Sequence, residues 1–177
     1  MAEYYPKGYK IPLINGSCAE IIQKLGEGGQ GVVYLVSVDG NKYALKWYHK
    51  GSVQNPKKFY RNLENNISKG APTKAFLWPL FLTKPVDNSF GYVMELRPKN
   101  YHEFSEFLLA KVHFHSLSAA VNAALNITNG FRELHRNGFS YQDLNDGNFF
   151  IDPENGDVLI CDNDNVAPYG ESLGIAG

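Results

Sequence analysis

The sequence predicts an α+β fold, with a β-rich N-terminal part and a mainly helical C-terminal part. Two apolar stretches, residues 32–38 and 42–48, flank Asp39-Gly40, a dipeptide that is typical of hairpin turns. Farther along the chain, apolar residues recur at helical spacing in residues 101–111 and 116–137. A short apolar run, residues 158–161, then leads to Asp162. Strands followed by helices are the order expected of the α+β class.

A glycine-rich segment, Gly26-Glu27-Gly28-Gly29-Gln30-Gly31, fits the pattern G-x-G-x-x-G. The same pattern opens dinucleotide-binding folds, but there a helix follows it. Here residues 32–38 read as a strand, so the segment joins two strands and is suited to cover a nucleotide. The Walker-type loop is absent from the sequence. A glycine hairpin that binds nothing is the alternative interpretation of this segment.

Four polar residues follow in an order that suggests phosphoryl transfer: Lys46, Asp143, Asn148 and Asp162. A lysine can neutralise phosphates, while two acids and an amide can supply a base and metal ligands. Charge distribution supports this, because no Lys or Arg follows Arg136 whereas eight residues there are Asp or Glu. Such a cluster attracts cations. A solvated acidic loop is the alternative for part of it.

With these motifs in order, the chain resembles the protein kinase superfamily from about residue 19 to its end, and in particular the bacterial-type serine/threonine protein kinases. Gly26, Gly28, Gly31 and Val33 match the glycine-rich loop, and Tyr43-Ala44-Leu45-Lys46 matches the family's V-A-I-K strand. The resemblance implies a small lobe over residues 1–97 with an αC helix. It also implies a partial large lobe over residues 98–177, which holds the catalytic loop, a metal-binding Asp and the start of the activation segment.

The resemblance also implies how ATP is bound. Lys46 would contact the α- and β-phosphates and be held by Glu64, the single acid between residues 47 and 86, although a solvated helix acid is the alternative. The resemblance makes Met94 the gatekeeper of the adenine site. The backbone of Glu95 and Leu96 in the hinge would bind the base, and three side chains would cover its faces: Val33, Ala44 and Phe150.

Catalytic and metal-binding roles follow from the same resemblance. Asp143 takes the position of the base, and Asn148, five residues later, would bind magnesium together with Asp162. Magnesium prefers hard oxygen ligands such as these. Asp164 is a further candidate metal ligand.

The chain departs from the family pattern in two motifs. Tyr141-Gln142 replaces the His-Arg pair before the base, so control by loop phosphorylation is not expected. Asp162-Asn163-Asp164 replaces D-F-G. In addition, the Asp143-Leu144-x-x-Gly147-Asn148 segment and the D-x-D pair resemble small-molecule phosphotransferases such as aminoglycoside kinases.

The remaining expectations concern partners and setting. The chain ends where an activation segment would begin, so we expect a fragment whose exposed apolar surface favours self-association. We expect a nucleotide and a protein substrate as partners, and neither nucleic acid nor a membrane segment. Two cysteines among 177 residues favour reduced thiols and a cytoplasmic protein. A nucleotide-binding pseudokinase that acts as a scaffold is the non-enzymatic alternative.

Overall fold

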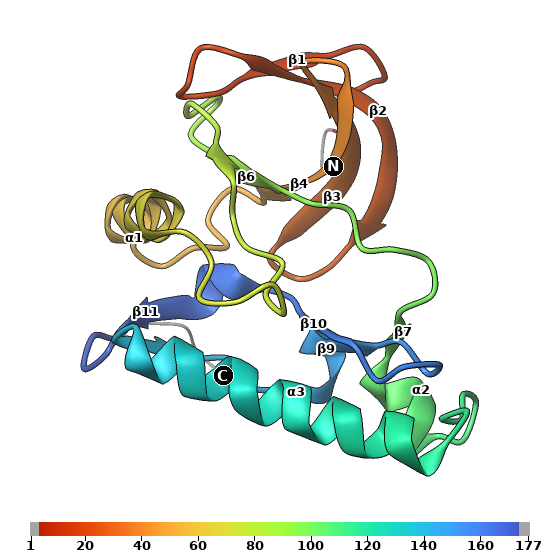
Figure 1. The fold of residues 1–177 in the computed structure, drawn as a ribbon. Coiled ribbons are helices and arrows are strands. Elements are labelled where there is room, and N and C mark those ends of the chain that lie inside the picture. The colour runs from red at the N-terminus through yellow and green to blue at the C-terminus, as the bar shows by residue number, and fades with distance from the viewer. Residues whose placement is uncertain (1–3, 174–177) are drawn as a thin grey trace. The chain divides into compact units, whose positions relative to one another are not determined.

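The computed structural model describes residues 4–173, which form two compact units (Figure 1). The first unit contains residues 4–70 and 79–96, and the second contains residues 71–78 and 97–173. The sequence placed one boundary after residue 97 and did not separate residues 71–78. That segment belongs to the second unit because Phe76 forms a parallel bridge with Ile160, and Leu77 N donates to Ile160 O at 2.9 Å. Residues 1–3 and 174–177 lie outside the described residues.

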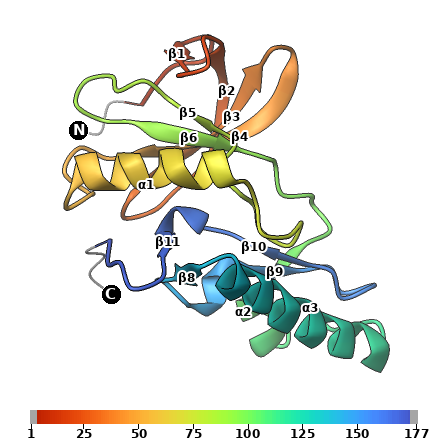
Figure 2. The same cartoon turned by 60° about the vertical axis from the view of Figure 1, so that its left-hand side comes forward.

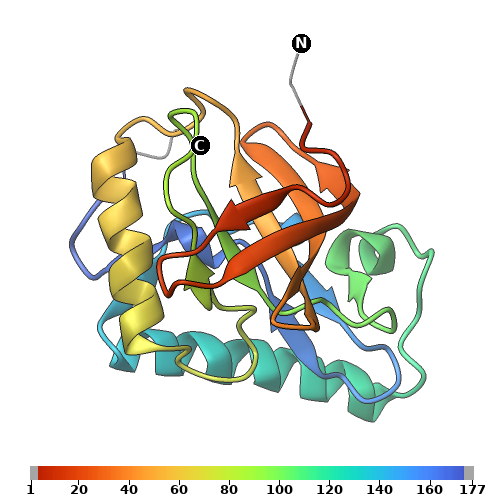
Figure 3. The same cartoon turned by 90° about the horizontal axis from the view of Figure 1, so that it is seen from above.

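An antiparallel six-stranded sheet in the order β1-β2-β3-β4-β6-β5 forms the first unit. Its strands are β1 Lys10–Pro12, β2 Cys18–Glu27, β3 Gly31–Val38, β4 Asn41–Tyr48, β5 Phe81–Leu82 and β6 Gly91–Met94. The predicted hairpin is confirmed, since β3 pairs with β4 from Gly31↔Tyr48 to Val38↔Asn41. Both of its turn residues, Asp39 and Gly40, have positive φ angles of 48° and 83°. Figure 3 shows β1 to β4 side by side in red to orange.

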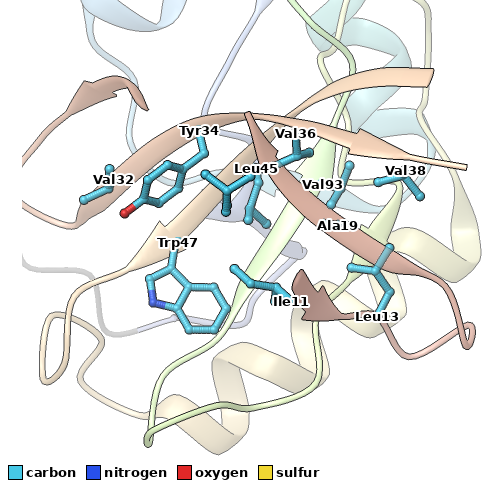
Figure 4. Packing of buried hydrophobic residues seen from close by; sticks show 11 residues of the cluster. Ile11, Leu13, Ala19, Val32, Tyr34, Val36, Val38, Leu45, Trp47 and Val93 are labelled. Atoms are coloured by element: carbon cyan, nitrogen blue, oxygen red, sulfur yellow. The ribbon is translucent and has the colours of Figure 1, made fainter. Parts of the chain in front are cut away.

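One face of this sheet carries the hydrophobic core of the unit. Side chains alternate between the two faces of a strand, so every second residue of β3 is buried on this face. The cluster comprises Ile11, Leu13, Ala19, Ile21, Val32, Tyr34, Val36, Val38, Leu45, Trp47 and Val93. Figure 4 shows these side chains packed together. Each large apolar side chain buried in this way contributes about 1.5–3 kcal/mol.

Helix α1, Pro56–Lys69, packs against the same unit beside β5 (Figure 2). It begins where the Asn55 side chain accepts from Lys58 N, and it ends at Gly70, whose φ is 78°. Two apolar residues, Phe59 and Leu63, anchor the helix on its buried side, and the Phe59 ring lies 5.4 Å from the Tyr48 ring. These two anchors determine which way the remaining side chains of α1 point.

The second unit combines helices with two small sheets. Its elements are β7 His102–Glu103, α2 Phe104–Leu108, α3 Leu117–Arg136, β8 Phe139–Tyr141, η1 Asp146–Asn148, β9 Phe149–Ile151, β10 Val158–Ile160, η2 Asn163–Asn165 and β11 Val166–Pro168. The sheets have the orders β10-β9-β7 and β11-β8. The helix expected over residues 101–111 is shorter, because its first residues pair as β7 with β9. No helix among the described residues is both long and apolar enough to cross a membrane.

Helix α3 confirms the prediction of a helix over residues 116–137. The apolar stripe expected to form its buried side is buried only in part, and its members are Leu117, Ala120, Val121, Ala124, Leu125, Phe131 and Leu134. Leu117, Val121 and Leu125 are 82%, 50% and 55% exposed. The buried residues are Ala119, Ala123, Gly130 and Leu134, of which only Leu134 belongs to the expected stripe. Small residues are needed there because the turn between β9 and β10 approaches the helix closely. A Cβ on Gly156 in that turn would lie 2.1 Å from the carbonyl oxygen of Ala119.

Candidate functional site

In the first unit, the residues predicted to bind a nucleotide share one face of the sheet. Directly opposite residues of antiparallel strands point to the same face. Val33 lies opposite Lys46, and Ala44 lies opposite Met94. The apolar cluster uses the alternate residues and therefore the other face. The structure thus brings Val33, Ala44, Lys46 and Met94 together, away from that core.

The glycine-rich loop connects β2 to β3 and is closed by a hydrogen bond from Gly28 N to Gly31 O of 2.9 Å. Gly31 is required by packing, because a Cβ there would lie 2.2 Å from the Trp47 carbonyl oxygen. At Gly26, Gly28 and Gly29 no described atom lies within 4 Å of an added Cβ, and none of the three has a positive φ. The fold therefore does not require glycine at these three positions, and the open space suits a close-approaching ligand.

An acidic residue in this loop, Glu27, is neutralised by its neighbours. Lys24 Nζ and the Tyr4 hydroxyl each donate to Glu27 Oε2 at 2.7 Å. The hydrogen bond from Lys24 lowers the pKa of the Glu27 carboxyl below its ordinary value. Because the carboxylate is engaged with a cation, it repels a phosphate group less than a free carboxylate would.

The ion pair expected between Lys46 and Glu64 stays a prediction. Lys46 is buried, whereas Glu64 lies on the exposed side of α1. The reason is the rotation of α1 set by Phe59 and Leu63. Because successive residues turn by about 100°, Glu64 faces outward when Leu63 faces the core. The buried polar residues of α1 are Asn62 and Asn66.

The remaining predicted adenine-site residues lie in two separate units. Met94 ends β6 and is 9% exposed, and it is followed by the exposed Glu95 and the half-buried Leu96. Phe150 lies on β9 of the second unit, where the Arg97 guanidinium stacks 4.2 Å above its ring. The adenine-binding roles of these four residues stay predictions.

In the second unit, a hydrogen-bond network joins the predicted base to the predicted metal ligands. The side chain of Asn148 donates through Nδ2 to the Asp143 carbonyl oxygen at 2.8 Å, which leaves Oδ1 for another partner. The Asn148 carbonyl oxygen in turn accepts from Cys161 N at 2.8 Å. Cys161 immediately precedes Asp162. Asn148 therefore links the segment of Asp143 to the segment that leads into Asp162. The catalytic and metal-binding roles of the three residues stay predictions.

Negative charge gathers near the Tyr141 ring in this network. The Tyr141 hydroxyl donates to the Cys161 carbonyl oxygen. Burial raises the pKa of Tyr141 above its ordinary value, and the nearby carboxylates of Asp162 and Asp164 raise it further. Asp162 itself has a left-handed φ of 52°, a conformation that Asp tolerates better than most residues.

The geometry of the carboxylates does not form a ready-made site for a metal bound by protein alone. Within residues 4–173, no group of three or more His, Cys, Asp or Glu side chains could hold a metal ion. One or two carboxylates, an amide oxygen and phosphate oxygens are sufficient for magnesium. Asn148 and Asp162 fit that donor set. Asp164 is fully buried, and its role as a second metal ligand stays a prediction.

Three amide side chains around this network were not predicted to have a role. Asn163, fully buried, donates through Nδ2 to the carbonyl oxygens of Leu77 and Ile160, both at 2.8 Å. Asn165 Nδ2 lies 3.4 Å from Asp143 Oδ2. Gln142 contacts residues 171 and 173 through its side-chain amide. The only signal in the sequence was that Gln142 and Asn163 replace the expected residues of the two altered motifs, and Asn165 had none.

A strand-rich unit with a glycine loop and a buried lysine, and a second unit in which Asn148 links the segments of Asp143 and Asp162, are the parts of a phosphotransferase-like fold. A family model for the protein kinase domain matches residues 19–171, which is most of the chain. The chain therefore belongs to the protein kinase family, and the predicted fold class is confirmed.

Among curated proteins, the chain is similar to a protein kinase and PP2C-like domain-containing protein of Arabidopsis thaliana. The two are 26% identical over an alignment of 152 residues, and the match covers 80% of this chain and 21% of the relative. The chain thus spans about a fifth of that relative.

Two solved structures share the fold. Vaccinia related kinase 3 has a TM-score of 0.68 at 16% identity, with 98% of this chain and 56% of that chain covered. The PknI kinase domain of Mycobacterium tuberculosis has a TM-score of 0.67 at 17% identity, with 92% of this chain and 63% of that chain covered. The chain spans less than two thirds of either structure.

Proposed function

We propose that this chain supplies an ATP- and magnesium-dependent phosphotransferase activity, with a serine or threonine hydroxyl of a protein as acceptor. The observation that carries the proposal is the network through Asn148, which joins the segments of Asp143 and Asp162 by two 2.8 Å hydrogen bonds. A base and a metal ligand on segments that are linked to each other are the parts that phosphoryl transfer requires. Membership of the kinase family supports the same class of reaction.

In this proposal each residue has a defined role. Asp143 orients the acceptor hydroxyl and accepts its proton as the oxygen bonds to the γ-phosphorus and ADP leaves. Asn148 Oδ1 and Asp162 would hold magnesium, which neutralises phosphate charge. Lys46 would contact the phosphates, and the unfilled space at Gly28 would admit them. Two free cysteines, Cys18 and Cys161, fit a cytoplasmic protein.

A nucleotide-binding scaffold without catalysis is the second candidate. The specific observation in its favour is that Glu64, the acid at the position of the αC glutamate, lies on the exposed side of α1. A small-molecule acceptor is the other alternative, favoured by the Asp162-x-Asp164 pair. Turnover separates the scaffold from both enzymes, and comparing a serine peptide with an aminoglycoside as acceptor separates the enzymes from each other.

The test is the thermal stability of the chain with ATP, with and without magnesium. A ligand at a hundredfold excess over its Kd stabilises the folded state by about 2.7 kcal/mol. In a chain of this size that corresponds to roughly 5–10 °C. We expect this rise only when both ATP and magnesium are present.

Variants then assign the roles. Asp162→Ala should lose the magnesium-dependent rise, while Asp143→Ala should keep the rise and lose phosphoryl transfer. Glu154→Ala, which removes an exposed acid of the same unit, is the matched control and should change neither. Full Mg-ATP binding by Asp162→Ala would refute the metal assignment.

A further inference from the structure

The side chain of Gln142 bonds to the backbone on both sides of Ser172. Its Nε2 donates to the Glu171 carbonyl oxygen, and its Oε1 accepts from Leu173 N at 3.0 Å. A neighbouring parallel strand would use its peptide group in the same way, by bonding the carbonyl before a residue and the N–H after it. The amide of Gln142 therefore acts as a one-residue strand for residues 171–173.

The same residue is fixed to the segment through its own backbone. Gln142 N donates to the Asn165 carbonyl oxygen at 3.0 Å, immediately before Asp143 in the chain. Upstream, β8 and β11 are paired from Val166↔Tyr141 to Pro168↔Phe139. Residues 165–173 are thus bonded along their length to the strand that leads into Asp143, and Gln142 makes the last of these connections.

These contacts need no charged partner. An arginine at this position of the family pattern requires an anion to balance it, whereas the glutamine amide is neutral and has one donor group and one acceptor group matched to a peptide. Leu173, whose N–H is bonded, is itself only 5% exposed. The segment after Asp162 can therefore be held without a phosphate group.

We propose that Gln142 is a positioning residue, whose side-chain amide clamps residues 171–173 to the catalytic loop and so keeps Asp143 in place without phosphorylation. The inference rests on the proposed function only for the role of Asp143. The clamp itself is a contact within the second unit and can be tested without turnover.

The first arm measures hydrogen exchange of the Leu173 amide by NMR in the whole chain. Gln142→Leu removes both bonds and should speed exchange at Leu173 about tenfold or more, with little change at Tyr169 N, which bonds to Gly138 O. Gln142→Glu keeps the acceptor and should retain most of the protection. Gln23→Leu, the same change at an exposed site, is the control. Equal exchange at Leu173 in the parent and Gln142→Leu would overturn the clamp.

The second arm measures Mg-ATP-dependent transfer to a serine peptide. A displaced base should lower kcat of Gln142→Leu by about tenfold, with KM for ATP unchanged within about twofold and partial rescue in Gln142→Glu. Phosphatase treatment of the parent should change nothing. An unchanged kcat in Gln142→Leu, or a parent that binds Mg-ATP without transfer, overturns the positioning role. A parent that fails to bind Mg-ATP overturns the proposed function. In that case the exchange rates at Leu173 still show whether Gln142 holds residues 171–173.

Discussion

At the scale of single residues, this chain substitutes hydrogen bonds for contacts that the family pattern makes with other residue types. Asn163 stands where the pattern has an aromatic residue, and it is anchored by two carbonyl oxygens rather than by packing. Each such bond contributes about 1 kcal/mol, and loss of the donor would remove one bond from each carbonyl, of which the Ile160 oxygen keeps its bond from Leu77 N. The side chain is therefore intolerant of an apolar replacement of similar size.

The Tyr141 hydroxyl offers a stability test with a defined pH dependence. Tyr141→Phe should lower the free energy of unfolding by about 1 kcal/mol at pH 8, because the Cys161 carbonyl loses its donor. The pKa of Tyr141 is raised in the folded state, so its stabilising contribution is complete below the ordinary value of 10.0 and declines as the pH rises above it. Urea unfolding at pH 8 and pH 11 should show the difference between parent and variant shrinking. A constant difference would contradict this account.

Two glycines of the same loop should respond in opposite ways. Gly31→Ala should destabilise the chain by about 1–3 kcal/mol, because its Cβ meets the Trp47 backbone. Gly28→Ala has open space around its Cβ, so it should keep stability within about 0.5 kcal/mol yet weaken Mg-ATP binding. Urea unfolding and calorimetric titration measure the two effects. Unchanged ATP affinity in Gly28→Ala would mean that the loop does not approach the nucleotide.

At the scale of elements, α1 and α3 show what a sequence pattern can and cannot determine. Helix α3 was expected from its periodicity, which is local, and α1 from the resemblance to the kinase family. The sides that the two helices bury were predicted poorly, because the rotation of a helix is set by what packs against it. In α3, the close approach of Gly156 selects small residues over the larger leucines. In α1, Phe59 and Leu63 turn Glu64 outward.

The same distinction applies to the candidate site, where features set by local sequence were predictable and contacts between distant residues were not. Asp143 and Asn148 were predictable because they lie five residues apart in one motif, and the β3–β4 register was predictable from its two-residue turn. The contacts of Gln142 with Glu171 and Leu173 were not predictable, because 29 and 31 residues separate the partners. No local pattern encodes a bond from a side chain to such a distant backbone.

The outward position of Glu64 yields a prediction for α1. Glu64→Ala should leave Mg-ATP affinity unchanged and stability within about 0.5 kcal/mol, as is usual for exposed sites. Leu63→Ala, one residue earlier and fully buried, should cost about 2–5 kcal/mol. Calorimetric titration and urea unfolding make the comparison. A tenfold loss of ATP affinity in Glu64→Ala would instead indicate that Glu64 pairs with Lys46.

At the scale of the whole molecule, a stripe of exposed apolar side chains on α3 is left uncovered by the other described residues. Leu117, Val121 and Leu125 follow one another at intervals of four residues, so they line one side of the helix. Each large apolar side chain removed from water contributes about 1.5–3 kcal/mol. Two chains that joined along this stripe would bury six such side chains.

We therefore expect the chain to self-associate through α3 as its concentration rises. Replacing Leu117, Val121 and Leu125 together with Gln should keep the chain monomeric while preserving the helix, since Gln has a helix propensity close to that of Leu. Sedimentation equilibrium measures the change in mass. Tyr169→Gln, at a residue that is 83% exposed, is the control for apolar surface elsewhere. Equal association of the triple variant and the parent would place the contact outside α3.

The two-faced sheet of the first unit has a consequence for heritable variation. Along β3 and β4, one set of alternate positions packs the core, and the other set includes Val33, Ala44 and Lys46. A mutational scan that scores abundance and function separately should show the two scores out of phase, with a period of two residues. Variants at Val36 or Leu45 would be lost through degradation, whereas variants at Lys46 would accumulate as folded protein without function.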